Sequence, residues 1–228
     1  MPGRDLVALK GDFLLENISL AYQAKADVPW GKEVPQEIFL NYVLPYASLN
    51  ERRDNWRADF YRRFIHTAQH SKNIDEAVMA LNKSVFDSLH VSYSAQKRPK
   101  PDQSPYESTQ ARYASCTGLS ILLTDALRSV GIPARIAGIA MWPDDSGNHT
   151  WVEIWDGEWH YTGAAEPGLL DHTWFTAKAS QTDPRHPIFA VSFRRTRLSF
   201  PMPWAPGLKF VSAQDVTSHY RHSRDAQP

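Results

Sequence analysis

The sequence contains a single cysteine, Cys116, among 228 residues. One cysteine excludes an internal disulfide framework and any zinc site built from several thiolates. Three roles stay open for it: a small buried side chain, a link between two chains, or a reactive thiol. The question of function therefore turns on the surroundings of Cys116.

The chain also lacks an excess of charge of one sign. Its 25 Lys and Arg residues balance 25 Asp and Glu residues, whereas a nucleic-acid binder would carry a basic surface. No apolar run approaches the roughly 18 residues that a membrane span needs. The first residues, MPGRDLVALKGDF, have no hydrophobic signal segment. We expect no nucleic-acid partner and no membrane span. The location is left open between the cytoplasm and, for a trimmed chain, the periplasm or secretion.

The periodicity of the apolar residues divides the chain into three parts. Residues 1–93 form a helical N-terminal part, residues 94–215 a core, and residues 216–228 a polar tail that we expect to be mobile. In the first part, residues 12–24 and 51–70 have helical spacing.

Two local signals refine the boundary between the first part and the core. Asp75 is a candidate cap for a further helix of the N-terminal part. The core begins with a polar stretch, residues 94–112, which contains three prolines and is expected to be a loop leading to the cysteine.

The best-defined helix of the chain begins at the cysteine, in the run TGLSILLTDALRSVGIP. Gly131 and Pro133 mark its end. Its apolar stripe consists of Leu119, Leu122, Leu123, Ala126, Leu127 and Val130. Cys116 therefore lies at or just before the first helical turn.

After this helix the pattern changes to the period of two that is typical of strands. Four segments have this period: residues 134–142, 149–155, 158–162 and 188–193. Asp156-Gly157 predicts a two-residue hairpin turn between the second and the third. Because His149, Trp151 and Glu153 share one face of the second strand, we expect His149 to face the start of the cysteine helix.

A cysteine at a helix start, followed by a histidine that opens a strand, suits nucleophilic catalysis. The positive end of the helix dipole favours a thiolate, and the free N–H groups there can bind an oxyanion. A nearby histidine takes the thiol proton and later gives it to a leaving amine. A carboxylate behind the imidazole fixes its tautomer.

The residues that carry this pattern resemble the transglutaminase-like cysteine enzyme superfamily. The run ASCTGLSILLTDALRSVGIPARIAGIA, followed by GNHTWVEIWDGEWHYTGAAEP, matches that family's pattern over roughly residues 105–175. The segment IFLNYVLPYASLNERRDNWR looks like the helical lead-in of bacterial members. The resemblance implies an α+β fold with a papain-like core, in which the cysteine helix packs on an antiparallel sheet. It also implies Cys116 as the nucleophile, His149 as the general base, and no cofactor.

The third catalytic position departs from the family. An aspartate usually follows the tryptophan of G-x-W by about four residues, and that position is Gly163 here. We favour Glu166 as the orienting carboxylate, with Asp171 as the alternative.

Three further residues are candidates for substrate or oxyanion contacts. Gln110 stands six residues before Cys116, a spacing that papain-like proteases use for an oxyanion-hole glutamine, and Gln103 is its rival at the other end of the loop. Trp151 is a weaker candidate for a substrate contact.

Other patterns have simpler explanations. His66 and His70 have helical metal-site spacing without an evident third ligand, and we expect no metal there or at His160, Asp171 and His172. The three N-x-S/T triplets are interpreted as chance matches, which favours a bacterial origin.

Together these features predict acyl transfer from an amide or peptide carbonyl through a thioester on Cys116. The expected substrate is a protein or peptide, and the oligomeric state is left open. Hydrolysis is favoured over transfer to an amine, because no sequence feature indicates a site that excludes water. The alternative is a catalytically inactive binding or structural module of a larger protein.

Overall fold

The centre of the fold is an antiparallel sheet of six strands in the order β5-β4-β3-β6-β8-β7, described over residues 3–222 by a computed structural model. The strands are β3 (Ala134–Ile139), β4 (His149–Trp155), β5 (Trp159–Thr162), β6 (Ile188–Val191), β7 (Leu198–Ser199) and β8 (Ser212–Asp215). A separate parallel pair joins β1 (Ser92–Tyr93) to β2 (Tyr113–Ala114). The predicted α+β class with an antiparallel sheet is confirmed.

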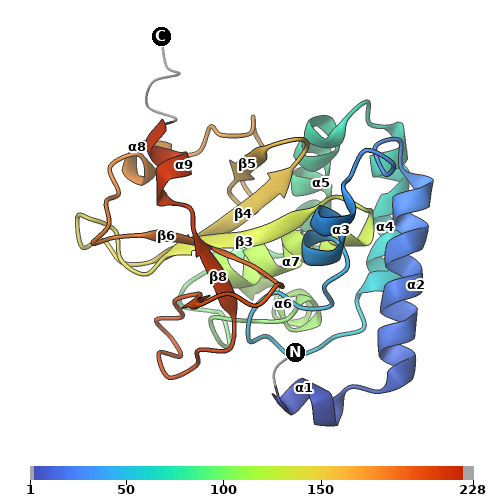
Figure 1. Cartoon of the computed structure of the whole chain (residues 1–228), viewed down its shortest axis with the longest axis horizontal. Helices are drawn as coiled ribbons and strands as arrows, with labels where there is room; N and C mark the ends of the chain where they lie inside the picture. Colours follow the sequence, from blue (N-terminus) through green and yellow to red (C-terminus); the bar gives the residue numbers. More distant parts are fainter. Residues whose placement is uncertain (1–2, 223–228) are drawn as a thin grey trace.

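The N-terminal helices lie together on one side of the molecule, and the two C-terminal helices lie at the opposite end of the sheet (Figure 1). They are α1 (Gly3–Ala8), α2 (Gly11–Asp27), α3 (Gln36–Tyr42), α4 (Arg57–His70), α5 (Ile74–Leu89), α6 (Pro105–Ala111), α7 (Cys116–Ser129), α8 (Thr176–Ala179) and α9 (Thr217–His222). Within residues 3–222, no helix has the length and apolarity needed to cross a membrane.

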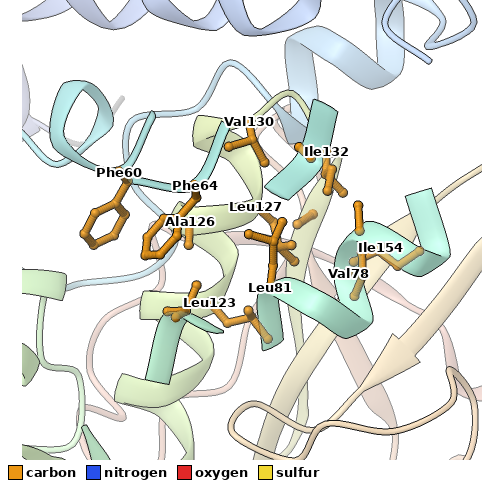
Figure 2. Packing of buried hydrophobic residues seen from close by; sticks show 14 of the residues in the cluster. Phe60, Phe64, Val78, Leu81, Leu123, Ala126, Leu127, Val130, Ile132 and Ile154 are labelled. Carbon is orange, nitrogen blue, oxygen red and sulfur yellow. The ribbon is translucent and has the colours of Figure 1, made fainter. Parts of the chain in front are cut away.

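Helix α7 joins the N-terminal helices to the sheet. One hydrophobic cluster contains Phe60 and Phe64 of α4, Val78 and Leu81 of α5, Leu123 and Leu127 of α7, and Ile154 of β4 (Figure 2). Burying one side chain of this size completely stabilises the fold by about 1.5–3 kcal/mol relative to leaving it exposed. Residues on both sides of position 94 therefore stabilise the same core.

A buried arginine fixes the N-terminal segments to the end of α7. Arg57 is 1% exposed, and its guanidinium donates to Asn17 Oδ1 at 2.7 Å, Arg128 O at 2.8 Å and Val43 O at 2.9 Å. Burial, with a smaller contribution from the neighbouring Arg128 charge, lowers the pKa of Arg57 to about 9. The several donors of a guanidinium suit such a group of converging acceptors.

Two N-terminal helices begin at residues other than those expected. The segment predicted as helix over 51–70 becomes helical at Arg57, because the Glu51 carboxylate instead accepts the N–H groups of Ser48 and Leu49 in a preceding loop. Helix α5 is capped by Asn73, which accepts the N–H of Glu76 at 2.9 Å, and not by Asp75.

The expected loop over 94–112 contains the short helix α6. Ser104 and Glu107 form a capping box in which each side chain accepts the backbone N–H of the other residue, and Pro105 is the first helical residue. The sequence S-P-Y-E holds this signal.

The hairpin after β4 is also longer than expected: it has three residues, 156–158, with positive φ at Gly157 and not at Asp156.

The expected mobile tail begins with an ordered helix, α9. Tyr220 on this helix is 1% exposed. Its hydroxyl accepts from Trp151 Nε1 at 2.7 Å and donates to Glu153 Oε1. A buried aromatic ring with two hydrogen bonds fixes the helix to the sheet, which corrects the prediction for residues 217–222. Residues 223–228, the rest of that tail, lie outside the described residues.

Candidate active site

A cavity of about 930 Å³ is lined by residues of α5, β1, α7, β4 and the loop after β5. Its walls include Cys116, His149 and Glu166, the three residues that sequence reasoning assigned to catalysis. Trp174, which the sequence did not single out, lines the same cavity. The candidate active site is therefore one cavity to which separate elements contribute.

Cys116 is the first residue of α7 and is half-buried. The preceding residue, Ser115, caps the helix: its hydroxyl accepts the N–H of Gly118 at 3.2 Å and donates to Pro101 O. The helical hydrogen bonds begin with Leu119 N–H to Ser115 O, so the helix leaves the N–H groups of its first two residues uncommitted. Two backbone donors are thus placed beside the thiol.

The start of α7 is tied directly to the start of β4. The hydroxyl oxygens of Thr117 and Thr150 are 3.1 Å apart, and Ser120 Oγ donates to Thr150 O at 3.2 Å. Helix α7 therefore packs on the face of β4 that carries Thr150, and His149 belongs to the opposite face. This corrects the expected orientation of His149, which still lines the cavity because it is the first residue of its strand.

His149 lies among aromatic rings. The centroid of its imidazole is 4.9 Å from that of Trp174, 5.0 Å from Phe175, 5.7 Å from Trp151 and 6.2 Å from Trp142. Its Nε2 atom is buried, and no residue of the described chain forms a hydrogen bond with it. Burial lowers the pKa of His149 to about 4. The neutral imidazole can accept a proton, but the cation that results lacks a partner in this arrangement.

Glu166 is held by Trp174. The indole N–H of Trp174 donates to Glu166 Oε1 at 3.0 Å, and the glutamate side chain folds over Gly163. Burial raises the pKa of Glu166, and the bond from Trp174 opposes that effect. Within the described residues no hydrogen bond joins Glu166 to His149, so the structure brings the two to one cavity without pairing them.

Asn82 of α5 fixes the loop that carries Glu166. The side chain is 1% exposed, and its Nδ2 donates to Thr162 Oγ1 at 3.1 Å, Gly163 O at 2.8 Å and Glu166 O at 3.2 Å. Its Oδ1 accepts the N–H of Ala165 at 3.0 Å. Sequence reasoning missed this role, although a polar residue among the apolar positions of a predicted helix was a signal for it.

The alternative acid, Asp171, serves a different cluster. Its carboxylate contacts His160 Nδ1 at 2.5 Å and accepts the N–H of Tyr161 at 2.9 Å. Burial of His160 lowers its pKa, but the contacts with Asp171 and Asp156 outweigh burial and raise it. Asp171 does not line the cavity that contains Cys116, so Glu166 is the better placed of the two acids.

The glutamine candidates for the oxyanion hole lie elsewhere. Gln103 and Gln110 line a second cavity of about 420 Å³ that includes neither Cys116 nor His149. Gln103 is fully buried, and its side-chain amide donates to Tyr113 O at 3.0 Å. Gln103 already uses that donor inside the fold, and neither glutamine lines the cavity of Cys116, so the backbone N–H groups at the start of α7 are the better placed oxyanion candidates.

The expected substrate contact at Trp151 is likewise corrected. Trp151 has no exposed surface and supports the imidazole of His149 from within the core.

Among the described residues no group of three His, Cys, Asp or Glu side chains is arranged to hold a metal ion. His66 and His70 instead stack their rings with centroids 4.0 Å apart.

The segment that contains the cysteine and the histidine matches a known family. The family model described as the transglutaminase-like superfamily matches residues 59–165. Over this segment, which is less than half of the 228 residues, the chain resembles the transglutaminase-like superfamily. Members are usually cysteine enzymes, and some are inactive. The match ends directly before Glu166, so Glu166 and Trp174 lie outside the matched segment.

Three solved structures are similar to this transglutaminase-like chain at low identity. A candidate cysteine protease from Cytophaga hutchinsonii is 17% identical (TM-score 0.41), and the match covers 92% of this chain and 65% of that one. EGTA-treated LapG from Legionella pneumophila is 16% identical (TM-score 0.42; 72% and 83%). The periplasmic domain of TgpA from Pseudomonas aeruginosa, bound to ethylmercury, is 19% identical (TM-score 0.35; 47% and 44%).

The transglutaminase-like chain thus spans less than two thirds of the length of the Cytophaga protein and less than half of the TgpA domain. A search of curated proteins finds no match to it.

Proposed function

We propose that this chain is a cysteine hydrolase that cleaves amide or peptide carbonyls of a protein or peptide substrate. One observation carries the proposal: the first residue of α7, Cys116, and the first residue of β4, His149, line the same cavity together with a carboxylate. The match of residues 59–165 to the transglutaminase-like superfamily supports a cysteine-based reaction in general.

The proposed reaction passes through a thioester. His149 takes the thiol proton, and the Cys116 sulfur attacks the carbonyl carbon to form a tetrahedral oxyanion. The N–H groups of Cys116 and Thr117 are the donors available to that oxyanion. The C–N bond then breaks as the imidazolium gives its proton to the leaving amine. Water, deprotonated by His149, then attacks the thioester carbonyl. The C–S bond breaks to release the carboxylic acid, and the Cys116 sulfur takes the proton back from the imidazolium.

Hydrolysis is favoured over transfer to a second amine because of how the cavity is lined. Trp174 on its wall is 58% exposed, so solvent reaches the group next to His149. Transfer to an amine requires a site from which water is excluded until the amine arrives. An exposed wall beside the base therefore supports water as the acceptor.

One observation favours a competing function, a catalytically inactive binding module. His149 Nε2 has no partner among the described residues, and Glu166 is bonded to Trp174 instead. A base without an orienting acid loses much of its catalytic effect. In this case the cavity would bind a peptide without cleaving it.

The deciding experiment compares the wild-type protein with Cys116→Ala. Each is incubated with a mixed peptide pool, with and without a primary amine, and the products are identified by mass. Hydrolysis predicts cleaved or deamidated peptides with the wild type alone, and transamidation predicts amine adducts. If neither product forms, and iodoacetamide labels Cys116 only as pH approaches about 8.5, the value of a free thiol, the inactive module is correct.

A further inference from the structure

Trp174 contacts both Glu166 and His149, the acid and the base that would have to interact for catalysis. Its indole N–H donates to Glu166 Oε1 at 3.0 Å, and its ring centroid is 4.9 Å from that of His149. The side chain is also 58% exposed. An exposed ring that contacts a base and an acid can move without unfolding the core.

We propose that Trp174 is a positioning residue that keeps Glu166 bound away from His149 in the free protein and releases it when a substrate enters. This inference rests on the proposed function and adds a substrate-dependent step to it. The released carboxylate would accept the N–H of the imidazole and stabilise the imidazolium that forms when Cys116 loses its proton.

The first argument comes from the unpaired imidazole. A buried ring nitrogen without a hydrogen bond is unfavourable, and a cation there is more so. Glu166 is the one carboxylate besides Asp87 on the described cavity wall, and Asp87 is occupied by a contact with Lys83. Glu166 is therefore the acid available to satisfy His149.

The second argument concerns which part of Glu166 can move. Asn82 binds the backbone carbonyl of Glu166, and it also holds the carbonyl of Gly163 and the N–H of Ala165. The backbone of Glu166 is thus fixed, whereas its carboxylate is held by one hydrogen bond, from Trp174. Rotation of the Glu166 side chain is sufficient, and Gly163 below it offers no side chain to obstruct the motion.

The third argument identifies the trigger. A peptide substrate in the cavity brings carbonyl oxygens that compete with Glu166 for the indole N–H of Trp174. Because this bond is exposed, the exchange replaces one hydrogen bond with another of the same kind. The step moves no electrons and needs no further reactant.

The test measures the rate at which iodoacetamide labels Cys116 at pH 7 in four proteins: wild type, Trp174→Phe, Glu166→Gln and the double variant. Phenylalanine keeps an aromatic ring beside His149 but removes the N–H. We expect Trp174→Phe to label about five to ten times faster than wild type, the factor given by stabilising the imidazolium by about one pKa unit. This increase in labelling rate must be absent when the double variant is compared with Glu166→Gln. Trp204→Phe, outside the cavity, is the matched control and should label like wild type.

Two outcomes overturn the positioning role while leaving the proposed function intact. One is a Trp174→Phe protein that labels like wild type. The other is an acceleration that persists unchanged when Glu166 is glutamine, because the effect then does not pass through the carboxylate.

A separate readout distinguishes failure of the proposed function. The indole N–H resonance of Trp174, assigned by its loss in Trp174→Phe, should shift as Glu166 titrates and should stay constant in Glu166→Gln. If it shifts while no variant labels Cys116 faster than a free thiol, the contact exists but the proposed function is wrong, and the positioning role is wrong with it. If it does not shift, the contact with Glu166 is refuted.

Discussion

The carboxylate of Glu166 occupies the space in which a side chain on Gly163 would lie. A Cβ atom built on Gly163 would be 2.2 Å from Glu166 Oε2 and 2.6 Å from its Cδ. Position 163 is where the family resemblance places an aspartate. The chain therefore keeps a carboxylate at this point of the fold, but supplies it from a residue three positions later.

This relationship predicts that the carboxylate can be moved back to position 163. In Glu166→Ala we expect the rate of peptide cleavage at pH 7 to fall by about tenfold to a hundredfold, because the general base then lacks the partner that it gains when a substrate enters. The double variant Glu166→Ala with Gly163→Asp should recover most of that rate, because the space is then free.

The single variant Gly163→Asp is the control for this exchange. With Glu166 still present, the new side chain collides with the existing carboxylate, so this protein should be less stable than the double variant in urea unfolding. A Glu166→Ala protein that cleaves peptides as fast as wild type would refute the role of the carboxylate altogether.

The pKa of His149 predicts a pH-dependent stability. Burial lowers it from 6.5 to about 4, so the unfolded chain binds a proton at this residue between those values and the folded chain does not. Stability is then complete above about pH 6.5 and is lost as pH falls towards 4, by up to about 3 kcal/mol. Urea unfolding of wild type and His149→Gln between pH 7 and pH 4.5 checks this.

Because other groups also titrate in this range, the informative quantity is the difference between the two proteins. The stability of wild type relative to His149→Gln should decrease steadily as the pH is lowered. Parallel curves with a constant offset would show that His149 keeps an ordinary pKa in the fold.

The sequence was sufficient for the elements that follow simple periodicity. The stripe of α7 is buried as expected, from Leu119 at 2% exposed to Val130 at 0%, because apolar spacing of this kind determines which face of a helix enters the core. The same holds for β4, whose bounds match the prediction. The resemblance to the superfamily is confirmed by the family model that matches residues 59–165.

The predictions that were wrong or missing concern contacts between segments that are distant in the sequence. The side of β4 that faces α7 follows from the Thr117–Thr150 contact, which the alternation of residues in the strand alone does not specify. Asn82 acts on residues about 80 positions later, and Trp174 reaches Glu166 across a loop. Sequence periodicity describes neighbours along one element and holds no information on such pairs.

Asn82 predicts a loss of both stability and reactivity on substitution. Asn82→Ala removes the donor to the Glu166 carbonyl, the acceptor of the Ala165 N–H and one of the donors to the Gly163 carbonyl, which should cost about 2–4 kcal/mol of unfolding free energy. Asn82→Asp should cost more, because a carboxylate oxygen would then face those two carbonyl oxygens. Denaturant unfolding measures both.

The control for this prediction is Asn55→Ala, which removes an exposed bond to Glu16 and should change stability by less than about 0.5 kcal/mol. Peptide cleavage by folded Asn82→Ala should also be slower, since the loop no longer holds Glu166. Equal effects of Asn82→Ala and Asn82→Asp would contradict the assigned donor contacts.

Tyr220 tests whether α9 is part of the folded core. The hydroxyl of this buried residue accepts from Trp151 and donates to Glu153, and Trp151 in turn stacks with His149 at 5.7 Å between centroids. Tyr220→Phe keeps the ring but leaves a buried N–H and a buried carboxylate oxygen unpaired, so we expect a loss of about 1–3 kcal/mol. Tyr93→Phe changes a side chain that is 61% exposed and should leave stability unchanged. If the two variants unfold at the same urea concentration, α9 does not stabilise the sheet beneath His149, and the expectation of a mobile segment is correct for residues 217–222.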